Sequence, residues 1–320
     1  MSTGAILDHV AADQATEGSQ IEYRGWRGRL TTGVNPFGTS GRERCIVHDR
    51  WGIRYLHDPV SDLVFCSPRF SQESLEACYQ SPTAHTDVRT FENFDRALWE
   101  SSRRRSYLVS RLKMNLINRY LSPGARVLDV GCHMGLFVLL CQEAGYDARG
   151  MDVSAPAIET GIRSVGAQNL RVAMIESADV EPESIDGLVI WDVLEHLYNL
   201  MEVMQACADA IKPGGYFFAQ IPNHRGLSAR LKTIAARIGL TGGKFNHFGF
   251  PWHLYHFSPR SLDLLMQRVG LKTVEIASFS HRSKLGQMRG PFTRFVERMA
   301  LSDYLYVVAR KETPACRRLR

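Results

Sequence analysis

The residues best suited to chemistry form a glycine turn with acidic residues on either side. Asp129, Gly131 and Gly135 lie where an apolar run typical of a strand gives way to one typical of a helix. The glycines permit a tight turn and close packing, and the following helix offers free N–H groups to a ligand. About 21 residues beyond Gly131, Asp152 ends the next strand-like run, where a carboxylate can accept hydrogen bonds from a ribose diol.

The glycine spacing narrows the kind of ligand. The pattern is G-x-x-x-G, which lacks the glycine that lets a dinucleotide-binding loop approach a pyrophosphate. Asp129 would repel a pyrophosphate but can pair with an ammonium group. Both acids suit a ligand with an amino acid at one end and a ribose at the other, such as S-adenosylmethionine. His133 stands where related loops often carry a further glycine, so its side chain must point away from this ligand or touch its methionine end.

Three later stretches carry groups that could orient an acceptor or take its proton. These stretches are residues 191–196, 222–224 and 253–258. Such groups belong in loops at the carboxyl edge of a parallel sheet. We predict His196 as the general base, with Glu195 beside it and His253 and His256 as the next choices. Asn223 could orient the acceptor. The structural alternative is that these residues cap a helix, close a turn or hold a segment by hydrogen bonds.

Alternating strand-like and helix-like runs from residue 125 onwards would position these groups. The periodicities predict strands at 125–131, 148–153, 169–175, 185–193 and 214–222, and helices at 136–145, 155–166 and 200–212. This alternation is typical of a parallel sheet with helices on both faces. After a helix at 261–270, the runs at 271–279 and 303–311 have no long helix between them, so we expect them to pair as a terminal antiparallel hairpin.

The expected fold class is therefore α/β. It comprises a doubly wound, seven-stranded, mostly parallel sheet with a terminal antiparallel hairpin, plus a small N-terminal accessory domain. A chain of 320 residues is long enough for both. The predicted parts are a disordered leader (1–20), the accessory domain (21–94), the main domain (95–312) with a lid insert (224–257), and a basic tail (313–320).

Successive motifs of the main domain resemble those of class I S-adenosylmethionine-dependent methyltransferases. They are VLDVGCHMGLF, GMDVS and DGLVIWDVLEHLYNLMEVMQACADAIKPGGYFFAQIPN, within roughly residues 105–311. The resemblance implies that Asp152 binds the ribose and that Asp129 lies at the amino-acid end. Ser177 and Ala178, after the third strand, would lie beside the adenine. The whole predicted cofactor set is Asp129, Gly131, His133, Gly135, Asp152, Ser177, Ala178 and Trp191.

No metal belongs to the predicted site, but one cluster leaves the question open. Asp192, Glu195 and His196 resemble the acidic-x-x-Glu-His cluster of ubiquinone-pathway O-methyltransferases, where it is associated with a divalent metal. Such a metal would lower the pKa of a catechol hydroxyl.

Residues 45–70 resemble the N-terminal zinc ribbon of one branch of these methyltransferases. The segments Asp49–Gly52, Leu63–Phe65 and Pro68–Arg69 match its pattern, but the second cysteine pair falls on Asp58 and Ser61. We predict a degenerate ribbon that lost its metal and keeps its fold by apolar packing. The alternative is a substitute zinc site made of Cys45, His48, His57 and Cys66. The branch includes enzymes that methylate sugars and natural products.

The lid insert contains an amphipathic helical pattern at 225–240. Leu227, Leu231, Ile234 and Ile238 recur at helical spacing, with basic residues around them. This segment is a lid above the cofactor, a surface that touches a membrane or a lipid-like substrate, or a helix packed on its own domain.

Composition excludes some classes of protein. A net charge of +6 permits an anionic ligand, but no continuous basic stripe with aromatic residues is present, so we expect no nucleic-acid partner. Seven scattered cysteines and the lack of a secretory signal favour reduced thiols and a cytoplasmic location. The sequence says nothing of the oligomeric state.

We therefore predict S-adenosylmethionine-dependent O- or C-methylation of a small molecule, such as a natural product, a sugar or a lipid-like intermediate. The alternatives are a catalytically silent protein of the same fold and a nucleic-acid methyltransferase. A nicotinamide oxidoreductase would suit the strand-and-helix alternation, but the glycine spacing and the terminal hairpin argue against it.

Overall fold

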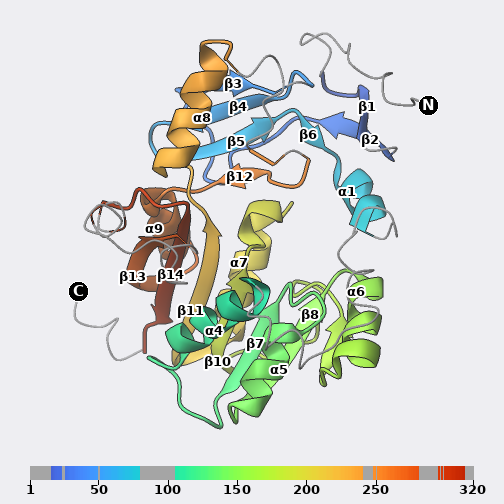
Figure 1. Ribbon diagram of the computed structural model, residues 1–320, viewed down its shortest axis with the longest axis vertical. Helices are drawn as coiled ribbons and strands as arrows, with labels where there is room; N and C mark the ends of the chain where they lie inside the picture. The colour runs from blue at the N-terminus through green and yellow to red at the C-terminus, as the bar shows by residue number, and fades with distance from the viewer. Residues whose placement is uncertain are drawn as a thin grey trace.

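The structure is a computed structural model in which a large α/β part carries a smaller β-rich part on one end (Figure 1). It describes residues 16–23, 26–49, 51–79, 105–240, 248–249, 251–280 and 299–313, with residues 295 and 297. The expected basic tail beyond 313 and all but the last few residues of the expected leader lie outside the described residues.

A seven-stranded sheet forms the large part, in the order β13-β14-β11-β10-β7-β8-β9. Strands β7 to β11 run parallel, whereas β14 is antiparallel to both β11 and β13. The predicted fold class and terminal hairpin are confirmed. The strands are β7 (Arg126–Val130), β8 (Asp147–Asp152), β9 (Leu170–Val172), β10 (Ile185–Trp191), β11 (Ile211–Pro222), β13 (Leu271–Phe279) and β14 (Tyr304–Lys311).

Helices cover both faces of this sheet because its central strands are apolar on both sides. Along β10, Leu188 and Ile190 belong to one buried cluster, whereas Val189 and Trp191 belong to the other. The first face packs on α7 and α9, and the second packs on α4 and α5. The helices of this part are α4 (Arg105–Ile117), α5 (Leu136–Glu143), α6 (Ala155–Thr160), α7 (Leu200–Ala210) and α9 (Pro259–Arg268).

Several element boundaries differ from the predicted ones. The helix predicted at 200–212 ends at Ala210, because Ile211 already pairs with Ile185 and begins β11. The helix predicted at 155–166 changes after Thr160 into a π-helical turn, Gly161–Val165. A Cβ on Gly161 would lie 2.5 Å from the carbonyl oxygen of Met134, so this turn packs directly on the glycine loop.

The smaller part contains two sheets and a short helix. One sheet has the order β1-β2-β6 and the other has the order β12-β5-β4-β3. Strand β12 comes from the far end of the sequence, so the predicted accessory domain 21–94 does not supply this sheet alone. The elements are β1 (Gln20–Tyr23), β2 (Trp26–Thr31), β3 (Arg44–His48), β4 (Arg54–Asp58), β5 (Leu63–Ser67), β6 (Arg69–Phe70), α1 (Gln72–Tyr79) and β12 (Tyr255–His256).

Helix α8 (Leu227–Arg237) forms where the amphipathic pattern predicts a helix, but it is not a lid over the cofactor loop. It lies beside β3 at the end of the molecule farthest from that loop (Figure 1), and Arg237 Nε donates to the carbonyl oxygen of Ile46 at 2.6 Å. Helix α8 therefore does not cover the cofactor loop, and a lid role for the whole insert 224–257 stays a prediction. Among the described helices, none is long and apolar enough to cross a bilayer.

Candidate active site

The glycine loop lies between β7 and α5. Gly131 has a φ of 79°, and a Cβ there would lie 2.5 Å from Val193 Cγ2. Gly135 has a φ of 72°, and its Cβ would meet Leu170 Cδ1 at 2.7 Å. Both positions combine a left-handed backbone with close packing, which only glycine accepts without strain. The glycines let the loop pack tightly between Val193, which follows β10, and Leu170, the first residue of β9.

His133 keeps the conformation that a glycine usually takes at its position. Its φ is 52°, and its backbone N–H donates to Asp152 Oδ2 at 2.8 Å. The other carboxylate oxygen of Asp152 accepts from the N–H of Ser154, also at 2.8 Å. Asp152 therefore fixes the loop to the end of β8, and each of its oxygens keeps a second lone pair for a ribose hydroxyl.

Asp129 fits the amino-acid end of the expected cofactor. Its side chain is buried, and Oδ1 has no hydrogen-bond partner among the described residues. Burial raises the pKa of this carboxyl to about 7, although the nearby Lys113 lowers it and Asp152 raises it further. A buried carboxylate oxygen without a partner is costly unless a cationic donor arrives, and an ammonium group is such a donor.

A cavity of about 200 Å³ lies between α4 and the ends of the central strands. Trp191 lines it, and the ammonium group of Lys113 lies 5.2 Å from the centre of the Trp191 ring. Lys113 also pairs with Asp192 at 3.3 Å. The same carboxylate accepts from Gln220 Nε2 at 2.9 and 2.8 Å. Aromatic walls come from Trp191, Phe279 and Tyr306, so a flat apolar group fits the cavity.

The residues predicted to contact adenine lie in the turn after β9. Ser177 is exposed, and both its N–H and its hydroxyl donate to the carbonyl oxygen of Met174. Ala178 packs partly against the core. This turn follows a parallel strand at its carboxyl end, as expected, and adenine contact remains a prediction.

Glu195, His196 and His253 come together at the end of β10. One ligand atom from each lies within 4.8 Å of the others, and the rings of the two histidines meet edge to face with centroids 4.8 Å apart. Glu195 and His196 lie in a short 3-10 turn, Leu194–His196, and His253 precedes β12. One carboxylate and two imidazoles could hold a divalent ion or share a proton.

A hydrogen bond fixes the tautomer of His196, and burial shifts the pKa values of Glu195 and His253 beside it. His196 Nδ1 lies 3.0 Å from the carbonyl oxygen of Trp252, which can only accept, so Nδ1 carries the proton and Nε2 keeps a lone pair. Burial and the charge of Asp192 raise the pKa of Glu195 well above its usual range. Burial lowers the pKa of His253 to about 4, so His253 is neutral at pH 7.

Asp192 lies near enough for its charge to act on Glu195, but its carboxylate is not among the three groups that come together. Its backbone has a φ of 58° directly after β10, and its carboxylate is held by Gln220 and Lys113. His253 takes its place in the ligand group. An Asp192, Glu195 and His196 metal set is therefore not the arrangement that the chain adopts.

Two other predicted site residues, His256 and Asn223, lie outside the group of three. His256 is buried in β12, with its ring 4.5 Å from that of Phe248 and 5.6 Å from that of Tyr55. Asn223 is buried, and its amide donates to the carbonyl oxygens of Ala300 and Ser302. The structural alternative applies to Asn223, whereas His256 adjoins the cluster through His253, at 6.1 Å between ring centroids.

The possible zinc ligands of the smaller part do not form one site. Cys45 Sγ and His48 Nε2 lie 3.4 Å apart at the surface. His57 instead pairs with Asp62 at 2.8 Å, and Cys66 is buried in the core, which raises the pKa of its thiol to about 12. Among the described residues, the one group of three or more such ligands is at Glu195, His196 and His253. The substitute zinc site is therefore wrong.

Sequence reasoning missed Lys113 and Gln220. Lys113 lies in a helix before the first sheet strand, and nothing local distinguishes it from a surface lysine. Gln220 had a usable signal, because it is a polar residue inside the apolar run FFAQIP of a central strand.

Together, the doubly wound sheet with its antiparallel hairpin, the glycine loop and the acids at the ends of β7 and β8 define a class I methyltransferase. Residues 100–276, more than half of the chain, match the family described as methyltransferase domain. The chain belongs to this family, and its methyl donor is S-adenosylmethionine.

The chain is also similar to individual proteins. The chain is 29% identical over 159 residues to a ubiquinone biosynthesis O-methyltransferase of Hahella chejuensis, covering 47% of this chain and 67% of that one. It is 25% identical over 210 residues to the enzyme of the same name from Nitrosospira multiformis, covering 63% and 82%. Among solved structures, it is similar to a SAM-dependent methyltransferase from Archaeoglobus fulgidus, with 22% identity, coverage of 67% and 98%, and a TM-score of 0.48.

Proposed function

We propose that this enzyme methylates a hydroxyl oxygen of a small molecule, with His196 as the general base. The names of the relatives support an oxygen acceptor. The observation that carries the proposal is the fixed tautomer of His196, because Nδ1 faces the carbonyl oxygen of Trp252 and the basic lone pair is therefore on Nε2, which lies 4.0 Å from Glu195 Oε1. Burial lowers the pKa of His253 and keeps its ring neutral. His253 therefore places no positive charge beside His196 that would oppose its protonation.

The reaction is an in-line displacement in which the chain's task is to position groups and to take a proton. Bound S-adenosylmethionine supplies a methyl group on a sulfonium, which leaves as a neutral thioether when the acceptor oxygen forms the new C–O bond. Asp129 would hold the ammonium end and Asp152 the ribose. The proton of the acceptor hydroxyl would pass to His196 Nε2. An acidic carbon acceptor could use the same base.

We infer a small acceptor with a flat apolar portion from the cavity beside Trp191, although its lining includes Lys113 and Gln220, which hold Asp192, and none of Glu195, His196 and His253. Phe279, Tyr306 and Leu112 supply apolar surface, and Gln220 supplies an amide. A natural product or a lipid-like intermediate would suit these walls better than a bare sugar.

The test is turnover of a catechol, phenol and sugar panel with a methyl-labelled donor, in wild type and His196→Asn. Asparagine can still donate to the carbonyl of Trp252 but offers no basic nitrogen. We expect turnover to fall about 10²–10⁴-fold while binding of S-adenosylhomocysteine is retained. His48→Asn, at the surface of the smaller part, is the control and should match wild type.

Two results would change this proposal. Wild-type turnover in His196→Asn would remove His196 from the proton transfer. Loss of turnover on chelation, restored by a divalent ion, would assign the Glu195, His196 and His253 group to a metal in place of a free base.

We also propose that α8 contacts an anionic lipid surface. Leu231, Ile234 and Ile238 form one apolar face and are 58%, 51% and 65% exposed. The helix has no acidic residue, and Arg230 and Lys232 are exposed beside that face. An apolar face flanked by cations complements anionic lipid headgroups better than a neutral partner.

Vesicle sedimentation tests this contact. Wild type should sediment with phosphatidylglycerol vesicles and not with phosphatidylcholine vesicles, and Leu231→Glu with Ile234→Glu should abolish sedimentation. Val274→Glu, on an exposed residue of β13, is the control. Equal sedimentation of the variant, or dimerisation of wild type that the variant removes, would contradict a lipid contact.

A further inference from the structure

Arg69 is a buried cation that no acid neutralises among the described residues. It lies in β6 and is 6% exposed, and its Nε has no hydrogen-bond partner within the described part of the chain. Its Nη1 donates to the hydroxyl of Tyr255 at 2.9 Å, and its guanidinium carbon lies 3.9 Å from the ring centre of Tyr198. Burying a charge without a counter-ion is unfavourable, so these two tyrosines are what make the position tenable.

The two tyrosines belong to the two segments that carry the histidine cluster. Tyr198 follows His196 by two residues, and Tyr255 follows His253 by two residues. One guanidinium from the smaller part therefore touches both segments of the main domain, whose histidine rings are 4.8 Å apart. The planar guanidinium stacks on Tyr198 and donates a hydrogen bond to Tyr255. These two contacts fix both the distance between the two segments and their relative orientation.

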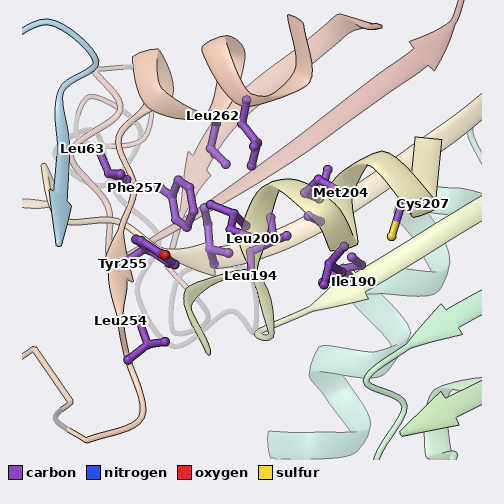
Figure 2. Packing of buried hydrophobic residues seen from close by; sticks show 14 of the residues in the cluster. Leu63, Ile190, Leu194, Leu200, Met204, Cys207, Leu254, Tyr255, Phe257 and Leu262 are labelled. Carbon is purple, nitrogen blue, oxygen red and sulfur yellow. The ribbon is translucent and has the colours of Figure 1, made fainter. Parts of the chain in front are cut away.

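Backbone hydrogen bonds also join the segments of His196 and His253 to the smaller part. The N–H of Leu254 donates to the carbonyl of Glu195 at 2.7 Å, and the carbonyl of Leu254 accepts from the N–H of Cys66 at 3.2 Å. Figure 2 shows Leu63 of β5, Tyr255 and Leu194 of the 3-10 turn in one buried cluster, with Leu254 at its lower edge. The smaller part thus meets the histidine-bearing turn through one intervening strand.

We propose that Arg69 is a positioning residue through which the N-terminal sheet sets the separation of His196 and His253. This inference rests on the proposed role of that cluster in proton transfer. The smaller part is then a component of the active site that contributes no group to the reacting atoms.

A second arginine contact between the two parts serves as a matched control. Arg225, just after β11, donates to the carboxylate of Asp62 on the turn between β4 and β5. His57 and His224 lie beside this ion pair, and their rings are 6.3 Å apart. The pair also joins the two parts, but neither residue contacts His196 or His253 in any described interaction.

The experiment compares Arg69→Met, Arg69→Lys and Arg225→Met in the full chain. The ring-proton resonances of ¹³C-labelled histidines are recorded across pH, and turnover is measured on the best acceptor. We expect Arg69→Met to move the resonances of His196 and His253 and to lower kcat at least tenfold with little change in KM. Arg69→Lys should recover part of this loss. Arg225→Met should move His57 and His224 instead.

Tyr198→Leu covers the case in which Arg69→Met fails to fold, because Tyr198 is only partly buried and Arg69 stays in place. Wild-type His196 and His253 resonances in Tyr198→Leu and Arg69→Lys, with thermal stability alone reduced, would overturn the proposal. The resonances of His196 and His253 test the positioning role of Arg69 even where no acceptor is methylated. A failure of the proposed function would appear in the turnover assay alone.

Discussion

Asp129 makes cofactor binding sensitive to pH. Burial holds the pKa of its carboxyl near 7, so the group is neutral in the folded protein at pH 5.5 and charged at pH 8. Only the charged form pairs with an ammonium group. Below pH 7, the affinity for S-adenosylhomocysteine should therefore fall by up to about tenfold per pH unit.

Asp129→Asn should weaken binding and remove this dependence on pH between 5.5 and 7.5. Calorimetric titration at several pH values measures both effects. The control is Asp147→Asn, which changes a carboxylate at the amino end of β8. This side chain is 41% exposed, so the variant should keep the wild-type pH profile. A profile in Asp129→Asn that matches wild type would assign the pH dependence to another group.

The conformation of the glycine loop depends on the absence of a Cβ at Gly131. Gly131→Ala places a Cβ 2.5 Å from Val193 Cγ2 and forces alanine to a φ of 79°. Gly166→Ala imposes almost the same backbone strain, at a φ of 76°, but its Cβ meets nothing within 4 Å. Both changes should cost about 1–2 kcal/mol of unfolding free energy from the left-handed backbone.

Gly131→Ala should cost more than Gly166→Ala and should also weaken S-adenosylhomocysteine binding, since Val193 or the loop must move. Urea unfolding and calorimetry measure the two quantities. Equal stability losses with unchanged affinity in both variants would mean that Val193 yields freely and that the close approach is unimportant.

Elements with long periodic patterns were predictable, and short ones were not. The strand predicted at 271–279 agrees with the structure, because apolar alternation acts locally. β12 could not be predicted, because two residues hold no period and the strand exists only through pairing with β5. The same limit hid the position of α8, whose pattern specifies a helix but not its neighbour.

The candidate site was predictable where groups follow neighbouring parallel strands. Asp129 and Asp152 end adjacent strands, so their convergence follows from the sheet. His253 meets His196 only because β12 joins the smaller part, and Lys113 reaches the site from a helix before the sheet. Such placements depend on tertiary packing that no local spacing records.

The two parts share one hydrophobic core at the scale of the whole molecule. Leu63 of β5 is fully buried in the same cluster as Leu194, Leu200 and Phe257 (Figure 2). Leu63→Ala should therefore lower the unfolding free energy of the entire molecule by about 2–5 kcal/mol. Hydrogen exchange should quicken in peptides of β10 and α7 as well as in β5.

Val60→Ala removes an exposed side chain three residues earlier and should leave exchange unchanged. Faster exchange confined to residues 44–70 in Leu63→Ala would indicate that the smaller part opens as an independent unit.

The pairing of β12 with β5 bears on how this protein could be shortened or recombined. The family match begins at residue 100, which suggests a cut that keeps the whole methyltransferase domain. A chain beginning there would leave Tyr255 and His256 without their partner strand and would uncover the apolar surface beneath them. Exposed strand edges and apolar patches promote aggregation. The borders of sequence homology and of foldable modules therefore differ here, and transplanting the catalytic domain means carrying its N-terminal sheet with it.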